Sequence, residues 1–302
     1  METILITGGS GLIGQALIPL LVEKGYSVNV LSRSNKKIKN VRVFLWDIDQ
    51  NEIDKEAFKG VDHIIHLAGL NVAEKRWTKS RKATMYNSRV KGAELLLNQI
   101  GELRIKSFIS ASGISIYGTK TSNHIFTEED TLNIHIEDFL AQLTVDWEKA
   151  AINFQSKVER LVILRTPIVL SANGGALKKM SKVIKSGFGS ALGSGQQWMP
   201  WIHINDLCKA YLKGIEDENF SGIYNVVAPE HVTNSAFTKA IATSFQKKIW
   251  APKVPAFLLK LLFGEMSKIV LNGSRLSGEK LSNHNFTYEF QNIDEALENL
   301  RN

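Results

Sequence analysis

The chain has 302 residues, of which 44% are hydrophobic, and it carries a formal net charge of +7. This length can bury one large core or two modest ones. Basic residues alternate with acidic ones, so we interpret the charge as a solvated surface and expect no nucleic-acid partner. The one cysteine, Cys208, excludes a disulfide framework and a Cys-x-x-Cys pair, and no metal site is predicted. No apolar run is long enough to span a membrane and no signal peptide precedes the first strand, so we expect a cytoplasmic protein without a membrane partner.

The N-terminal stretch predicts a strand, a glycine-rich turn and a helix in direct succession. Residues 2–6 form an apolar, β-branched run, and apolar residues recur at helical spacing over residues 15–21. Glycines three residues apart allow a tight turn, close approach of a ligand and close helix–strand packing. We therefore predict dinucleotide binding, with the diphosphate at the helix start, and the alternative is a plain glycine turn. The residues expected to contact the cofactor here are Gly8, Ser10, Gly11, Leu12, Ile13 and Gly14.

The end of the second predicted strand distinguishes between the two nicotinamide dinucleotides. Residues 27–32 are typical of a strand, and Ser32 is followed by Arg33 instead of an acid. An acid at this place binds the ribose of NAD, whereas an arginine accommodates the 2′-phosphate of NADP. We therefore favour NADP(H) over NAD(H); the alternative is an ordinary exposed arginine. Asp47, after a third strand over residues 41–46, could bind the adenine amino group or cap a helix, and both options stay open.

Further strands alternate with helical stretches along the first half of the chain. Residues 61–67 and 106–112 have strand patterns, and residues 77–99 have a helical one between them. This alternation predicts an α/β fold with a doubly wound parallel sheet of the Rossmann type. Small residues after residues 61–67 would let a cofactor lie close over the sheet. His66 is interpreted as a packed core histidine, because no other ligand stands at metal spacing from it.

Several stretches together resemble the extended short-chain dehydrogenase/reductase superfamily. They are residues 7–14, 66–69, 110–112 with 117–118, 164–167 and 201–207. Residues 174–177 and 192–198 are similar to bacterial epimerase-family proteins that end in a domain of unknown function, here about residues 252–300. The resemblance implies a Rossmann domain over residues 1–170, joined by elements near 200–227, and a smaller C-terminal substrate domain within 171–302. It also implies cofactor contacts from Leu67, Ala68, Gly69, Ala111, Thr166 and Pro167.

The chain departs from the superfamily where the catalytic groups should be. The resemblance implies a Tyr-x-x-x-Lys pair, but matching the following glutamate places Leu140 and Thr144 at these positions. Gly113 replaces the usual hydroxyl partner. Proton transfer would then need other groups, and the candidates, of which the first four are preferred, are Ser112, Tyr117, Glu128, His203 and Asp138. Without a catalytic role, Ser112 would lie in a turn, Tyr117 would pack in the core, and Glu128 would face solvent or cap a helix. His203 would then orient its loop, and Asp138 would cap a helix.

The second half offers candidate substrate contacts. Gln197, Trp198 and Trp201 could line a pocket, since clefts favour aromatic residues with a few polar groups, or could pack between domains. Residues 187–195 are expected to form a mobile loop over the cofactor. The hypothesis is an NADP(H)-binding oxidoreductase-like protein for a small carbonyl or sugar-like substrate, as a monomer or homodimer. The alternatives are a non-catalytic NADPH-binding scaffold or sensor and, less favoured, a nucleotide-sugar epimerase.

Overall fold

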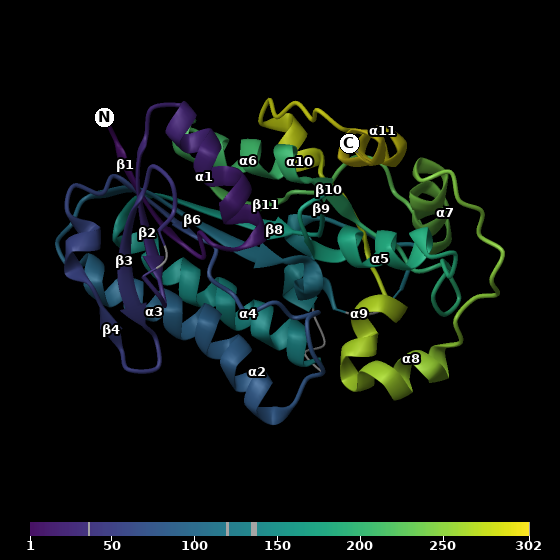
Figure 1. Cartoon of the computed structure of the whole chain (residues 1–302). Helices are drawn as coiled ribbons and strands as arrows, with labels where there is room; N and C mark the ends of the chain where they lie inside the picture. The colour runs from purple at the N-terminus through teal and green to yellow at the C-terminus, as the bar shows by residue number, and fades with distance from the viewer. Residues whose placement is uncertain (36, 119–120, 134–137, 302) are drawn as a thin grey trace.

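The computed structural model describes residues 1–35, 37–118, 121–133 and 138–301, and a large twisted sheet forms its centre (Figure 1). The sheet has eight strands in the order β11-β8-β6-β5-β1-β2-β3-β4. Its pairs are parallel except at the β3–β4 edge. This order confirms the predicted doubly wound α/β fold. The strands are β1 (Thr3–Thr7), β2 (Ser27–Ser32), β3 (Arg42–Asp47), β4 (Glu52–Ile53), β5 (His63–His66), β6 (Ile105–Gly113), β8 (Val158–Thr166) and β11 (Gly222–Asn225).

Helices cover both faces of this sheet (Figure 1). One face carries α1 (Leu12–Glu23) and α6 (Ile204–Glu216), which contact each other. The other face carries α3 (Gly92–Ile100) and α4 (Phe139–Ile152), with α2 (Lys79–Tyr86) leading into α3. A π-helix over Asn87–Lys91 joins α2 to α3, so the helical stretch predicted over residues 77–99 contains one irregular turn. Single 3-10 turns cover Lys55–Phe58, Ile114–Tyr117, Glu128–Asn133, Asn153–Ser156 and Gly264–Ser267.

The burial pattern follows from a sheet covered on both faces. All five residues of β1 are buried, as expected for a strand with helices above and below it. Leu17 and Leu21 of α1 pack into one core cluster. Phe108 of β6 stacks on Phe154 in the cluster on the opposite face, with ring centroids 3.6 Å apart. The helices therefore fix the sheet from two sides, and its strand ends are left to form a site.

In the second half of the chain, β8, β11 and α6 belong to the sheet and its covering layer, and α5, α7, α8 and α9 lie beside the carboxyl ends of the strands (Figure 1). Two parallel pairs, β9–β10 and β7–β12, lie outside the large sheet. Ion pairs Lys82–Glu265 (2.5 Å) and Asp138–Lys268 (3.3 Å) tie the region after α8 to α2 and α4. The division into residues 1–170 and 171–302 stays a prediction. The remaining elements are β7 (Ile125–Phe126), β9 (Ile168–Leu170), α5 (Gly175–Lys185), β10 (Trp201–His203), α7 (Asn234–Ser244), α8 (Ala256–Phe263), α9 (Lys268–Leu271), β12 (Arg275–Leu276), α10 (Glu279–Asn283) and α11 (Ile293–Arg301).

The glycine-rich segment 187–195 makes specific contacts with later parts of the chain. Leu192 N donates to Asn234 Oδ1 at 2.8 Å, and Gly193 N donates to the Val254 carbonyl at 2.9 Å. A Cβ on Gly195 would lie 2.1 Å from Ser235 Oγ. These contacts seat the segment against α7 and residue 254. Its place as a mobile loop over the cofactor stays a prediction.

Candidate functional site

A pocket of about 460 Å³ opens at the carboxyl edge of the sheet, between the ends of β1, β2, β3 and β5. The strand order reverses between β1 and β5, which is where doubly wound folds bind ligands. Of the predicted cofactor residues, the wall contains Gly8, Ser10, Gly11, Ser32, Arg33, Asp47, Leu67, Ala68 and Gly69. It also contains Ser34, the second serine beside Arg33. Residues of the wall that the sequence analysis did not single out are Leu31, Trp46, Ile48, Asp49, Leu70, Asn71, Thr84, Asn87 and Ser88. Predicted residues outside this wall are Leu12, Ile13, Gly14, Ala111, Thr166 and Pro167.

The turn between β1 and α1 needs glycine for two separate reasons. Gly8 has a φ of +72°, and a Cβ there would lie 2.7 Å from the carbonyl carbon of Leu67. A Cβ on Gly14 would lie 2.6 Å from the Cα of Gly9, so the first turn of α1 packs directly on the loop. No side chain within the described part of the chain caps α1. Its free N–H groups and this bare backbone fit a diphosphate group.

Polar groups surround the other end of the pocket. Arg33 is exposed at the rim, beside Ser32 and Ser34. Asp47 Oδ1 accepts hydrogen bonds from Asp49 N (2.9 Å) and Gln50 N (3.1 Å), so Asp47 caps a turn while it lines the pocket. Both of its open sequence interpretations are therefore compatible with its position. A guanidinium with two hydroxyl groups beside it suits a phosphate.

Two hydroxyl groups occupy the region where the superfamily's catalytic groups are expected. Thr144 Oγ1 lies 2.6 Å from Ser115 Oγ and 2.8 Å from the Leu140 carbonyl, to which it donates. A Cβ on Gly113 would lie 3.7 Å from Thr144 Oγ1. Ser115 is half-buried and was missed by the sequence analysis; its place two residues after Gly113, on the turn Ile114–Tyr117, is the signal that could have found it. Leu140, Thr144 and Gly113 thus meet as the resemblance implies, with Ser115 added.

Ser112, Tyr117 and Glu128 come together in a separate, buried polar network. Arg165, 1% exposed, donates from Nε to Glu148 Oε1 and from Nη2 to Glu148 Oε2, both at 2.8 Å. Ser112 Oγ donates to Glu148 Oε1 at 2.5 Å. Burial alone would lower the pKa of Arg165, but the Glu148 carboxylate outweighs it and raises that pKa. This ion pair joins α4 to the ends of β6 and β8.

Tyr117 has both hydrogen-bonding roles of its hydroxyl filled. It accepts from Arg165 Nη1 at 2.8 Å and donates to Asn225 Oδ1 at 2.7 Å. Glu128 Oε1 accepts from Asn225 N at 2.7 Å. Burial raises the pKa of Tyr117 to about 12. A tyrosine held in this way positions its neighbours and is poorly suited to exchange a proton with a substrate.

The remaining candidates are used in packing and capping. His203, 1% exposed, accepts from Asn205 N at 3.1 Å through Nδ1 and caps α6, and burial lowers its pKa to about 4. Trp201 is fully buried in the core, and Gln197 Nε2 donates to the carbonyls of Leu192 and Val270. Asp138 caps α4 through Leu140 N.

Trp198 and His66 are also held by hydrogen bonds. The half-buried Trp198 donates to the Ser122 carbonyl at 3.1 Å and stacks against Arg275. His66 is a core histidine, as predicted: it bonds Thr7 Oγ1 at 2.8 Å, and burial lowers its pKa to about 4. Of the predicted substrate contacts, Trp198 is therefore the one that remains partly exposed.

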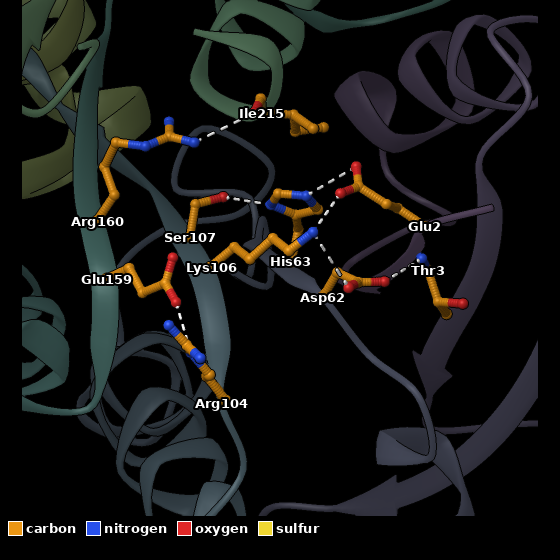
Figure 2. A network of polar contacts seen from close by, with 10 residues as sticks. All are labelled: Glu2, Thr3, Asp62, His63, Arg104, Lys106, Ser107, Glu159, Arg160 and Ile215. Carbon is orange, nitrogen blue, oxygen red and sulfur yellow. Dashed lines mark hydrogen bonds and ion pairs between the residues drawn. The ribbon is translucent and has the colours of Figure 1, made fainter. Parts of the chain in front are cut away.

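A second polar network lies at the opposite, amino-terminal edge of the sheet (Figure 2). His63 Nδ1 lies 2.8 Å from Ser107 Oγ, and its Nε2 lies 3.3 Å from Glu2 Oε2. A serine, a histidine and a carboxylate in this order are typical of nucleophilic catalysis. Ser107, however, is completely buried, so no substrate reaches it. We interpret this network as structural.

The described residues form neither a cluster of metal ligands nor a membrane-spanning helix. Within residues 1–35, 37–118, 121–133 and 138–301, no three His, Cys, Asp or Glu side chains gather as metal ligands. The helices formed by these residues include none with the length and apolar character needed to cross a membrane.

Comparison with known proteins places this architecture in a family. A model described as the NAD dependent epimerase/dehydratase family matches residues 4–227. The chain belongs to this epimerase/dehydratase family. A second model, for a domain of unknown function called DUF1731, matches residues 254–300. Epimerase family protein Mb2239 of Mycobacterium bovis is 33% identical over 97% of this chain and 95% of its own. Epimerase family protein SH2119 of Staphylococcus haemolyticus is 32% identical over 99% of both.

Solved structures of this epimerase/dehydratase type superpose over the whole chain. The human epimerase family protein SDR39U1 (isoform 2), solved with NADPH, is 26% identical, with a TM-score of 0.86 over 99% of both chains. A nucleoside-diphosphate sugar epimerase from Corynebacterium glutamicum is 29% identical, with a TM-score of 0.80. The latter match covers 99% of this chain and 58% of the Corynebacterium chain.

Proposed function

We propose that this protein binds NADP(H) in the pocket at the carboxyl edge of the sheet and acts as an oxidoreductase on a small carbonyl or sugar-like compound. The observation that carries the cofactor assignment is the meeting of the bare glycine turn and Arg33 in one pocket. The turn would hold the diphosphate, and Arg33 with Ser32 and Ser34 would hold the 2′-phosphate. The similar human protein solved with NADPH supports the same choice.

When bound, NADPH supplies hydride chemistry; the protein supplies position and polarity. The half-buried Ser115 hydroxyl is the polar group offered to a substrate oxygen. Because Thr144 donates to the Leu140 carbonyl, its Oγ1 accepts from Ser115 in the free protein, and the Ser115 hydrogen would turn to the substrate oxygen when one binds. A serine hydroxyl does not ionise near neutral pH, so Ser115 would orient the substrate by hydrogen bonding while water supplies the proton.

Calorimetric titration tests the cofactor assignment first. Wild-type protein should bind NADPH more tightly than NADH. Arg33→Asp should weaken NADPH by tenfold or more while changing NADH little, since a charge-assisted hydrogen bond contributes about 1.5–3 kcal/mol. Equal losses for both cofactors would show that Arg33 does not recognise the 2′-phosphate. Absence of NADPH binding by the wild-type protein would overturn the proposal.

NADPH oxidation across a panel of aldehydes, ketones and keto-sugars then tests the activity. Ser115→Ala should lower kcat for any accepted substrate. Ser110→Ala is the matched control, because the Ser110 hydroxyl donates to the neighbouring Ala111 carbonyl inside β6. Equal kcat values for Ser115→Ala and wild type would remove Ser115 from the mechanism.

A second candidate function is a non-catalytic NADPH sensor. Leu140 and Thr144 stand where proton-transfer groups are expected, and the Tyr117 hydroxyl is fully engaged. In that case cofactor binding would stabilise one conformation for a partner to recognise. Tight NADPH binding without oxidation of any compound in the panel favours the sensor, and a measurable turnover excludes it.

A further inference from the structure

Arg89 is a buried cation that has no carboxylate partner among the described residues. It is 9% exposed and belongs to the π-helix Asn87–Lys91. Its Nη1 donates to the Met85 carbonyl at 3.3 Å and its Nη2 to the Leu70 carbonyl at 3.0 Å. The Cζ lies 5.0 Å from the ring centroid of Trp147. No ion pair within 4.0 Å joins Arg89 to an acid of the described residues. Burial lowers its pKa to about 10, so it remains charged at neutral pH.

The guanidinium lies directly behind the floor of the cofactor pocket. A Cβ added to Gly69 would lie 2.9 Å from Arg89 Cζ and 3.0 Å from its Nη2. Gly69 is exposed and lines the pocket, so its backbone alone separates the cation from the ligand space. Ser88 Oγ accepts from Leu70 N at 3.0 Å and holds the same loop. The π-helix thus fixes the loop and the charge together, and such irregular turns recur at functional sites.

The same chain shows how a buried arginine is otherwise neutralised. Arg165 is also buried, and it is paired through two hydrogen bonds with Glu148. Burying a charge without a counter-charge is unfavourable, and backbone carbonyls offset only part of that cost. An anion in the adjoining pocket would supply the missing negative charge. We expect the diphosphate to be the part of a dinucleotide near Gly69, because the glycine turn that would bind it contacts the neighbouring residue. A Cβ on Gly8 would lie 2.8 Å from Ala68 N.

We propose that Arg89 is a positioning residue whose buried charge balances the diphosphate of the bound cofactor across the backbone of Gly69. This inference rests on the proposed cofactor site and assigns to that site a charge that does not touch the ligand. If the inference is right, the binding affinity that Arg89 contributes depends on the diphosphate. It does not depend on the nicotinamide or on the 2′-phosphate.

The test compares three ligands by calorimetric titration. NADPH and 2′-phospho-ADP-ribose both carry the diphosphate, and the second lacks nicotinamide. Adenosine 2′-phosphate (2′-AMP) keeps the 2′-phosphate but has no phosphate at the 5′ position. The measured quantity is the ratio of Kd for 2′-AMP to Kd for 2′-phospho-ADP-ribose. A partly unfolded variant scales both constants alike, so this ratio reports the site and not the fraction folded.

Arg89→Gln should lower this ratio at least tenfold and weaken NADPH and 2′-phospho-ADP-ribose equally, whereas Arg89→Lys, which keeps the charge, should retain most of the ratio. If Arg89→Gln does not fold, Arg89→Met retains the apolar contact with Trp147 and takes its place. Arg160→Gln is the matched control, because Arg160 lies near the start of β8, away from the carboxyl edge of the sheet, and donates to the carbonyls of Gly214 and Ile215. Figure 2 shows the contact with Ile215.

Two results would overturn the role of Arg89. One is an unchanged ratio in the charge-removing variant, and the other is an equal fall in Arg89→Lys. A wild-type protein that binds none of the three ligands would instead overturn the proposed function itself.

Discussion

Replacing Glu148 by glutamine should destabilise the protein more than any change at a surface ion pair. The side chains of Arg165 and Glu148 are 1% and 6% exposed, and two hydrogen bonds of 2.8 Å join them. Glu148→Gln keeps the shape but leaves the Arg165 charge buried without compensation, and it also weakens the bond from Ser112. Breaking a buried pair in this way costs about 3–5 kcal/mol. That is a large part of the roughly 5–15 kcal/mol by which proteins are stable.

Urea denaturation followed by circular dichroism measures this effect. With a slope of about 3 kcal/mol per molar urea, a loss of about 4 kcal/mol moves the midpoint down by roughly 1.3 M. The control is Glu159→Gln, which breaks the exposed Arg104–Glu159 pair at 2.7 Å (Figure 2). That pair is 89% and 49% exposed, so its loss should cost under about 1 kcal/mol.

A double variant distinguishes the loss of the Arg165–Glu148 ion pair from the cost of leaving the Arg165 charge buried and unpaired. Adding Arg165→Met to Glu148→Gln removes the stranded guanidinium, so the double variant should be more stable than Glu148→Gln alone. Equal midpoints for Glu148→Gln and Glu159→Gln would refute the idea that burial makes the first pair important. A double variant less stable than Glu148→Gln would refute the uncompensated-charge explanation.

Three further predictions concern pH, thiol chemistry and the glycine turn. The depressed pKa of His66, about 4 against 6.5, means that its stabilising contribution is complete above pH 6.5 and is lost as pH falls toward 4. Unfolding free energies at pH 7.5 and 5 should therefore differ by about 2 kcal/mol more in wild type than in His66→Asn, and parallel curves would contradict this. Cys208 is buried and burial raises its pKa to about 12, so a thiol reagent should react with it only after urea unfolding; fast labelling of the native protein would refute this. Gly14→Ser should abolish detectable NADPH binding, because its Cβ would meet the Gly9 backbone at 2.6 Å. Gly25→Ser has open space around it but a φ of +88°, so it should lose about 1–2 kcal/mol of stability and still bind NADPH.

The glycine turn and the sheet were predictable because their signals are local. The apolar residues of β1 by themselves indicate a buried strand. The glycine at position 8 indicates a positive φ, which other residues rarely adopt. The short strands β7, β9, β10 and β12 gave no such signal. Strands of two or three residues are too short to show a period, and each pairs with a distant partner.

The contacts between the polar groups of the site could not be predicted from the sequence, because they join residues that are far apart in the chain. Tyr117 and Asn225 are 108 residues apart, and Ser115 and Thr144 are 29 apart. Their meeting depends on how α4 packs over the ends of β6 and β8, which no local pattern encodes. The family resemblance identified the positions of Leu140, Thr144 and Gly113, but it gave no reason to single out Ser115 or Arg89, because neither carries a role in that resemblance.

The pairing of β7 with β12 has a consequence during protein synthesis. The proposed cofactor pocket is lined by residues from Gly8 to Ser88, whereas Leu276, which pairs with Phe126, is synthesised well after strand β7. At ordinary rates of translation the delay between the two strands is on the order of ten seconds. During that interval Phe126, whose ring centroid lies 5.3 Å from that of Tyr117, lacks its partner strand. A nascent chain would therefore hold the residues of the proposed cofactor pocket before β7 and β12 pair.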